Sequence, residues 1–399
     1  MYDVIIVGAG ASGTFCALSL KYNNPNLNVL LLEKNDKLGK KLLITGNGRC
    51  NIGNKNINIS DYNSNSSLEY FKKIIETGSD NYAYLLKTFG VFITNEENRL
   101  YPCSNQALTV CKSFERALIN YGVEVKYNYD VNNINKVNDM FIINNSLKSK
   151  MVVIATGGKT YSKTGSTGMG YELLKSFGHN ITNLYPSLTS LKTNFKYIKD
   201  LAGVRVNSKV SLYDSRCLVS EEKGQLQFTK DSLSGICIFN LSRYIGKLID
   251  NKKELSVRVD FMPDNTFDEL YDYIKSFSNY NLEDAISCIL NNKLAMVIAK
   301  NIKLAGKKVS SLSDSDLTIA VENIKNMKFD IIGTGDFENA QVTCGGVFLN
   351  EFTSDLESNK CKGLYAIGEV LDVDGKCGGY NLSWAFNSAL IVSDIISKK

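Results

Sequence analysis

Histidine is almost missing from this sequence, since His179 is the single example among 399 residues. Histidine is a common zinc ligand and the base of Ser-His-Asp hydrolases, so its scarcity argues against a histidine-built metal site and against that hydrolase mechanism. His179 follows the glycine of Phe177-Gly178-His179, a pattern typical of a helix end, which favours a structural role over that of a base. We therefore expect no metal site and expect the chemistry to belong to a bound cofactor.

Long apolar runs are missing as well. No run approaches the roughly 18 residues that cross a bilayer, and residues 1–8 lack the basic start and long apolar core of a secretory signal. The ten cysteines never occur in Cys-x-x-Cys spacing, and without such a signal we expect reduced thiols. The sequence thus predicts a cytoplasmic protein that makes no use of a membrane.

Neither sign of charge dominates the chain. The net charge of +5 is small for this length, and the lysines are scattered rather than gathered into a stripe. Clusters in which basic and aromatic residues alternate, as RNA-binding surfaces often have, are not evident. We expect a small-molecule substrate and no nucleic-acid partner, and the sequence leaves the oligomeric state open.

Apolar segments near both ends of the chain have the pattern of buried parallel strands. Residues 3–7 and 29–32 are short unbroken apolar runs on either side of a helical pattern over 12–22, which predicts a β-α-β unit. Similar runs at 151–155 and 363–367 are predicted to be further strands of the same domain. The predicted fold class is therefore α/β, with a Rossmann-like domain assembled from both ends of the chain.

The middle of the chain has a different pattern. Short alternating segments between 186 and 262 are typical of antiparallel strands, and residues 264–327 have helical periodicity. The prediction is an inserted antiparallel β domain and a helical subdomain. The predicted boundaries are 1–185 with 345–399 for the Rossmann-like domain, 186–262 with 329–344 for the β domain, and 263–328 for the helical subdomain.

A glycine-rich turn follows the first predicted strand and opens the first predicted helix. In Gly8-Ala9-Gly10-Ala11-Ser12-Gly13, Gly8 allows the tight turn, Gly10 allows a pyrophosphate to approach the backbone, and Gly13 allows close helix–strand packing. Glu33 ends the second strand 20 residues after Gly13, where its carboxylate can accept hydrogen bonds from ribose hydroxyls. This motif predicts a dinucleotide site, but it does not separate FAD from NAD.

Glycines at later strand ends favour FAD. Ala155-Thr156-Gly157 closes one strand, and Gly368-Glu369 closes another with a carboxylate that can bind the ribityl chain of FAD. Gly379-Tyr380-Asn381-Leu382 opens the last helix, whose N–H groups would face the flavin edge that becomes negative on reduction. An additional dinucleotide fingerprint is not expected, because Gly333-Thr334-Gly335 lacks a strand–helix setting.

Long sequence stretches carry a family resemblance. The run Gly39–Asn51, the segment Gly165–Tyr171 and the run Gly368–Gly375 resemble the bacterial family of BaiN-type reductases, aminoacetone oxidase and YhiN-like flavoproteins. The resemblance implies FAD as cofactor and a glutathione-reductase-type FAD domain that is split by the inserted domains. It also implies NAD(P)H as a possible electron donor.

The same resemblance implies the residues that contact FAD. The adenosine and phosphates would be contacted by Ala11, Ser12, Glu33 and Lys34, with Val131 touching adenine through its backbone. Further residues expected to lie along the cofactor are Lys41, Arg49, Cys50, Asn51, Glu369, Asn381 and Leu382. Arg49 is expected to anchor a phosphate, and Cys50 is expected to be a small buried residue rather than a redox thiol.

This sequence departs from the family at three positions, and the first two fall in the inserted domain, where they bear on the substrate more than on FAD. Lys230 stands where histidine is common, Ile236 where proline is common, and Cys377 where threonine is usual. We therefore expect an FAD oxidoreductase that exchanges a hydride with a small organic substrate, without a catalytic acid or base that the sequence identifies. Reduction of an activated C=C bond with NAD(P)H, oxidation of a small amine such as aminoacetone, and a non-catalytic flavin redox sensor all stay open.

Overall fold

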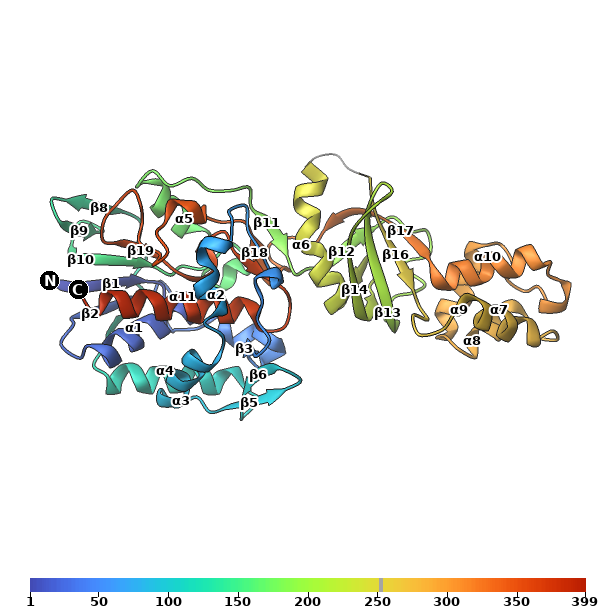
Figure 1. The fold of residues 1–399 in the computed structure, drawn as a ribbon, viewed down its shortest axis with the longest axis horizontal. Helices are drawn as coiled ribbons and strands as arrows, with labels where there is room; N and C mark the ends of the chain where they lie inside the picture. The colour runs from blue at the N-terminus through green and yellow to red at the C-terminus, as the bar shows by residue number, and fades with distance from the viewer. Residues whose placement is uncertain (251–253) are drawn as a thin grey trace. The chain divides into compact units, whose positions relative to one another are not determined.

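The chain forms two compact units in the computed structural model, which describes residues 1–250 and 254–399. The first unit combines Met1–Tyr185 with Phe337–Lys399, and the second unit is Pro186–Asp336. Each unit has its own cluster of buried apolar side chains. The first unit is therefore discontinuous in sequence, as Figure 1 shows by the blue and red segments that share it.

A seven-stranded sheet forms the centre of the first unit, in the order β7-β2-β1-β10-β9-β8 with β19 also paired to β10. Its parallel strands are β1 (Tyr2–Val7), β2 (Val29–Leu32), β7 (Glu124–Lys126), β10 (Leu147–Ile154) and β19 (Leu364–Ala366). The antiparallel strands β8 (Ile134–Val137) and β9 (Met140–Ile143) complete the sheet. The pairing Val152↔Leu364 brings the C-terminal segment into the sheet that the N-terminus begins.

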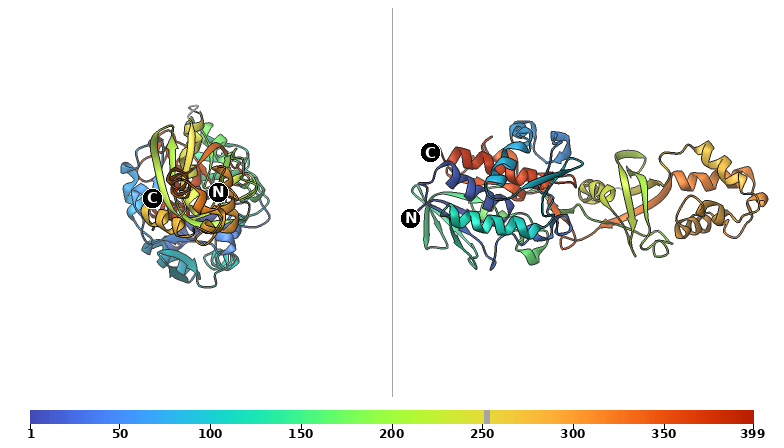
Figure 2. Two further views of the ribbon diagram at one scale, coloured as in Figure 1. Left: turned by 90° about the vertical axis from the view of Figure 1, so that its right-hand side faces the viewer. Right: turned by 90° about the horizontal axis from the view of Figure 1, so that it is seen from below.

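Two helices from opposite ends of the chain lie side by side along this sheet. They are α1 (Ala11–Asn23) and α11 (Tyr380–Ile396), and the rings of Phe15 and Phe386 meet with centroids 5.1 Å apart (Figures 1 and 2). The amide Nδ2 of Asn23 donates to Asp394 at 2.8 Å, so the end of α1 is tied to the end of α11. The predicted Rossmann-type fold and its assembly from both ends of the chain are confirmed.

Smaller elements surround the sheet of the first unit. Strands β3 (Gly53–Asn54), β6 (Arg99–Pro102) and β5 (Ile93–Glu96) form a three-stranded sheet, and β4 (Tyr62–Asn63) pairs with β20 (Asp374–Gly375). The unit also contains α2 (Lys72–Glu76), α3 (Asp80–Thr88), α4 (Ala107–Asn120), α5 (Met169–Lys175) and β18 (Val342–Cys344). Strand β11 (Tyr185–Ser187) runs through the boundary of the two units.

The second unit contains a closed barrel in the order β12-β15-β14-β13-β16-β17. The strands are β12 (Leu191–Thr193), β13 (Arg205–Asp214), β14 (Cys217–Phe228), β15 (Ser232–Ser234), β16 (Leu255–Asp260) and β17 (Met327–Thr334). Four helices follow β16, namely α7 (Phe267–Ser276), α8 (Leu282–Ser287), α9 (Asn292–Asn301) and α10 (Asp314–Lys325). Capping boxes at Thr266 and Ser313 begin α7 and α10.

One segment within 186–262, where the sequence predicted short antiparallel strands, is a helix instead. Helix α6 (Ile236–Asp250) occupies 15 residues there and packs against β14. Its buried residues Cys237, Leu241 and Ile245 recur at four-residue intervals, which is a helical rather than an alternating pattern. The division of the second unit into a β domain and a helical subdomain stays a prediction.

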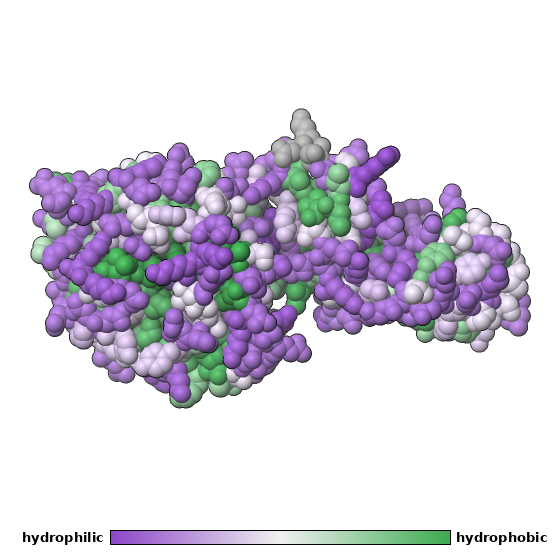
Figure 3. Space-filling model, in the orientation of Figure 1, coloured by the Kyte–Doolittle hydropathy of each residue, from purple (hydrophilic) through white to green (hydrophobic). Residues whose placement is uncertain are grey.

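None of the helices in the described ranges is long and apolar enough to cross a bilayer. Hydrophilic residues cover most of the face in Figure 3, and apolar residues occur there in separate patches.

Candidate cofactor site

The turn between β1 and α1 is packed so closely that two of its residues must be glycine. Gly8 has φ +105°, and a Cβ on it would lie 2.6 Å from the carbonyl oxygen of Ala155. A Cβ on Gly13 would lie only 1.9 Å from the carbonyl oxygen of Gly8. These two glycines therefore hold the helix against the strand ends.

Gly10, in contrast, faces open space. A Cβ on Gly10 would meet no protein atom within 4 Å, and Gly10 caps α1 without any side-chain hydrogen bond. The backbone N–H groups of Ala11 and Ser12 find no acceptor among the described residues, since the helix's first bond runs from Thr14 N to Gly10 O at 3.1 Å. Open N–H groups beside a bare backbone suit a phosphate.

Glu33 lies at the end of β2 beside this turn and is only 8% exposed. Its Oε2 accepts from the backbone N of Ala9 at 2.9 Å, and its Oε1 accepts from the backbone and side chain of Asn35 at 2.9 and 2.7 Å. Tyr129 N donates to Glu33 O at 2.9 Å, so the segment leading to the buried Val131 runs beside it. The carboxylate is thus fixed next to the helix start, where a ribose would lie.

Lys34, the next residue, points elsewhere on the surface. Its Nζ donates to Thr167 Oγ1 at 3.1 Å, within the glycine-rich segment before α5. The predicted contact of Lys34 with FAD stays a prediction.

The carboxylate of Glu369 contacts residues that lie within or after several strands. Glu369 Oε2 forms an ion pair with Lys41 Nζ at 2.8 Å, and its Oε1 accepts from Thr343 N at 2.9 Å. Lys41 also donates to Thr160 Oγ1 at 2.7 Å. A Cβ on Gly158 would lie 2.8 Å from Glu369 Oε1, so the end of β10 meets this carboxylate directly. Residues 41, 155–160, 343 and 369 therefore form one polar cluster.

Gly368 packs against the start of α1 and the first half of α11. It has φ +72°, and a Cβ on it would lie 2.7 Å from Ser12 Oγ. Trp384 Nε1 donates to Gly368 O at 3.1 Å, and Gly368 N donates to Ser388 Oγ at 3.0 Å. Trp384 and Ser388 were not among the predicted site residues, because their helix had to be placed beside Gly368 before the contacts were visible.

The start of α11 packs on the segment that follows the matched run. Gly379 has φ +97°, and a Cβ on it would lie 2.3 Å from Gly53 O. With its amide oriented to satisfy its neighbours, Asn51 accepts from Gly379 N at 3.1 Å and donates to Gly53 O at 2.9 Å. The Asn381 side chain accepts from Gly375 N at 2.8 Å and donates to Gly375 O at 2.9 Å. The backbone N–H of Asn381 takes no part in these bonds and lies at the start of α11.

Arg49 has a protein partner rather than a free guanidinium. Its Nη2 lies 2.7 Å from both carboxylate oxygens of Glu96, and its guanidinium carbon lies 4.1 Å from the centroid of the Tyr101 ring. Its predicted contact with a phosphate stays a prediction.

Cys50 has the surroundings of an inert thiol. It is fully buried with φ +58°, and burial raises the pKa of its thiol to about 11. Such a thiol stays protonated at neutral pH, which fits a packing role rather than a redox role.

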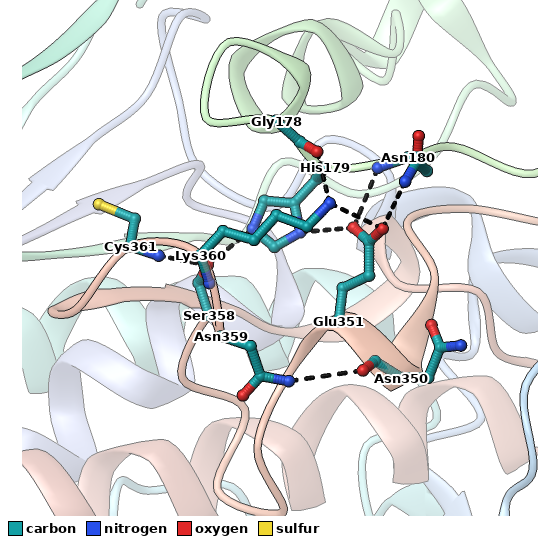
Figure 4. A network of polar contacts seen from close by, with 9 residues as sticks. All are labelled: Gly178, His179, Asn180, Asn350, Glu351, Ser358, Asn359, Lys360 and Cys361. Atoms are coloured by element: carbon teal, nitrogen blue, oxygen red, sulfur yellow. Dashed lines mark hydrogen bonds and ion pairs between the residues drawn. The ribbon is translucent and has the colours of Figure 1, made fainter.

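The single histidine lies apart from these strand ends. His179 Nδ1 is 2.9 Å from Glu351 Oε2, and its Nε2 is 2.8 Å from Ser358 Oγ (Figure 4). Glu351 also binds Lys360 at 2.8 Å and Asn180 at 2.6 Å. The histidine side chain is fully buried, so it ties segments together rather than facing a substrate.

The site as a whole fits FAD. The open backbone at Gly10 and the N–H groups of Ala11 and Ser12 suit a diphosphate. The two fixed carboxylates, Glu33 and Glu369, suit the ribose and ribityl hydroxyls. The strand ends after β1, β10 and β19 meet around these groups. Fold and site together define a Rossmann-type dinucleotide-binding protein.

Comparison with known proteins identifies the family. Residues 2–394 match the family described as the HI0933-like protein Rossmann domain, and the chain belongs to it. This confirms the resemblance expected from the sequence motifs. Family membership and the fit of the site make the chain an FAD-dependent oxidoreductase.

Individual relatives cover nearly the whole chain. A 3-dehydro-bile acid delta(4,6)-reductase of Clostridium scindens is 32% identical over 97% of this chain and 97% of its own length. A ribosomal RNA dihydrouridine synthase of Haemophilus influenzae is 27% identical over 99% of this chain and 98% of its own. The solved 3-ketosteroid delta1-dehydrogenase from Sterolibacterium denitrificans shares the fold, with a TM-score of 0.52 at 11% identity over 100% of this chain and 99% of its own.

Proposed function

We propose that this protein reduces a carbon–carbon double bond that is conjugated to a carbonyl group, with NAD(P)H as electron donor. The observation that carries the proposal is the 32% identity, over 97% of both chains, to a reductase named for such a bond in a 3-dehydro-bile acid. Formation of dihydrouridine, for which another relative is named, likewise saturates a C=C bond next to a carbonyl. The shared chemistry supports the proposal at the level of the bond rather than of the whole substrate.

The reaction balances with one NAD(P)H and one proton for each double bond. NAD(P)H becomes NAD(P)+, a hydride is delivered to the β-carbon, and a proton is added at the α-carbon. FAD, when bound, supplies the hydride exchange between donor and substrate. The donor would reach the site from solution, since no further dinucleotide fingerprint is expected in the sequence.

The chain's own residues bind and orient the cofactor. The N–H groups of Ala11 and Ser12 would hold the diphosphate at the start of α1. Glu33, already fixed by Ala9 N, would accept from ribose hydroxyls. Lys41 neutralises and orients Glu369, whose remaining lone pairs face the ribityl chain in this proposal.

Two kinds of substrate are candidates, and they differ greatly in size. A steroid-like enone is favoured by the more similar relative, whereas ribosomal RNA enters through the relative named a dihydrouridine synthase. The scattered lysines and the net charge of only +5 favour the small molecule.

The decisive experiment follows the FAD absorbance of the purified protein without oxygen. We expect NADH or NADPH to bleach the flavin, and a steroid 4,6-dien-3-one to restore its colour with loss of the dienone absorbance. Parallel samples receive unmodified ribosomal RNA, with dihydrouridine measured by mass spectrometry, or aminoacetone. The proposal fails if neither nucleotide bleaches the flavin, or if only aminoacetone does so and peroxide forms in air.

A further inference from the structure

Within the described residues Arg99 has no carboxylate partner, although Glu96 lies directly opposite it on the neighbouring strand. In the hairpin of β5 and β6, Glu96 pairs with Arg99, and opposite charges in that position usually attract one another. Both oxygens of Glu96 instead lie 2.7 Å from Arg49 Nη2. The guanidinium of Arg99 forms no hydrogen bond or ion pair with any residue in the described ranges.

The Arg99 side chain is directed to the loop before α11. Its backbone pairs with Asn54, whose Nδ2 donates to Gly378 O at 3.0 Å. Arg99 Nε lies 3.8 Å from the point that a Cβ on Gly378 would occupy. Its charge also reaches the Cys377 thiol, where burial raises the pKa and Arg99 opposes that rise.

A second positive group faces the same loop. Gly379 caps α11 without a side-chain hydrogen bond, and the N–H groups of Asn381 and Leu382 meet no acceptor within residues 1–250 and 254–399. The start of a helix carries a partial positive charge. Arg99 and the start of α11 thus create a place suited to negative charge.

We propose that Arg99 stabilises the negative charge that bound FAD gains on reduction at the α11 end, and so raises the cofactor's affinity for electrons. The inference rests on the proposed function, in which a hydride leaves NAD(P)H as NAD(P)+. That hydride brings two electrons and one proton, so the cofactor gains one negative charge. Arg99 transfers no proton and acts by position and charge alone.

Sulfite is a suitable probe, because it adds reversibly to oxidised flavins, bleaches them and leaves negative charge on the ring. In FAD-loaded protein, Arg99→Gln is expected to raise the dissociation constant for sulfite about tenfold, since a charge-assisted contact is lost. Arg99→Lys keeps the charge and should restore most of the affinity. Lys55→Gln removes an exposed charge from the adjoining strand end and should change the affinity less than about twofold.

The outcome is separable from that of the proposed function. An Arg99→Gln protein with full FAD content and sulfite affinity within about twofold of wild type would overturn the inference, while dienone reduction by the wild type is judged independently. If Arg99→Gln does not retain FAD, Cys377→Asp places a neutralising carboxylate beside Arg99, with Cys377→Asn as the uncharged match. Weaker sulfite binding only in Cys377→Asp supports the inference, and equal binding in both refutes it.

Discussion

Individual glycines of the β1–α1 turn serve different purposes, and the sequence motif alone does not separate them. Gly13 has no room for a side chain, since its Cβ would overlap Gly8 O at 1.9 Å. Gly10 has ample room within the protein, and its φ of −80° suits any residue. Gly13 therefore maintains the fold, and Gly10 leaves open space where we propose that the cofactor binds.

We predict that Gly10→Ala and Gly13→Ala separate cofactor binding from folding. Gly10→Ala should leave the stability of the FAD-free protein within about 1 kcal/mol of wild type, while FAD affinity falls by about tenfold or more because the pyrophosphate loses its close approach. Gly13→Ala should destabilise the FAD-free protein by about 1–3 kcal/mol or more. Denaturant unfolding and FAD titration by calorimetry measure both quantities. Equal FAD affinity in Gly10→Ala and wild type would contradict the assigned site.

Arg49 shows where prediction from residues stops. Its motif implied a contact with FAD, but 47 residues separate it from Glu96, the carboxylate that binds it. Only the folding of the β5–β6 hairpin beside residue 49 brings these two side chains together. The same hairpin leaves Arg99 without an ion-pair partner among the described residues, and no sequence pattern marked Arg99 in advance.

At the scale of elements, the network around His179 connects the end of α5 with two turns near residues 351 and 358. Neutral His179 donates from Nδ1 to Glu351 and accepts at Nε2 from Ser358, whose Oγ already accepts from the N–H groups of Lys360 and Cys361 (Figure 4). If Nε2 carried a proton, it could not donate that proton to Ser358 Oγ, because both lone pairs of this oxygen already accept from backbone N–H groups. The arrangement is therefore satisfied only with a neutral imidazole.

This network should make the first unit lose stability on acidification. Burial lowers the pKa of His179, although the hydrogen bond that its Nδ1 donates to Glu351 acts in the opposite direction. The contribution of neutral His179 to stability is therefore complete above about pH 6.5 and is lost as the pH falls through the folded-state pKa. Burial alone would raise the pKa of Glu351, but Lys360, Asn180 and His179 outweigh it and hold the value at about 2. The contribution of the ionised Glu351 carboxylate to stability is complete above about pH 4.5 and is lost as the pH falls toward 2.

Glu351→Gln should therefore destabilise the protein near neutral pH by on the order of 2 kcal/mol and by much less at pH 3. Chemical denaturation at several pH values measures the difference. Because His179 is the only histidine, its NMR titration needs no assignment, and a pKa at or above 6.5 would contradict the neutral assignment.

The elements themselves were largely predictable, with α6 as the exception. The strands at both ends of the chain, the helices beside them and the helical segment at 264–327 follow from apolar patterns. Helix α6 was overlooked because it lies among alternating strands, and its apolar positions become meaningful only against the face of β14 that they cover.

At the scale of the whole molecule, two separate apolar cores predict two unfolding events. We expect calorimetry to resolve two transitions, of which free FAD at about 100 times its dissociation constant raises only one, by about 5–10 °C. The shifted transition should be that of the first unit, where the candidate site lies. A single transition that shifts as a whole, or two that shift equally, would show that the units unfold together.

The sequence by itself determined the cofactor class, the family and the Rossmann-type fold, because glycines and carboxylates at strand ends leave little choice of backbone or ligand. It also predicted Glu33 and Glu369 as cofactor-binding residues, since the carboxyl ends of parallel strands meet at one edge of the sheet. Only the tertiary structure decided which charges are paired. It shows that Glu96 binds Arg49, whereas the Arg99 side chain lies beside the loop before α11. Ion pairing depends on distances of a few ångströms between segments that lie far apart in the chain, and no local pattern of residues specifies them.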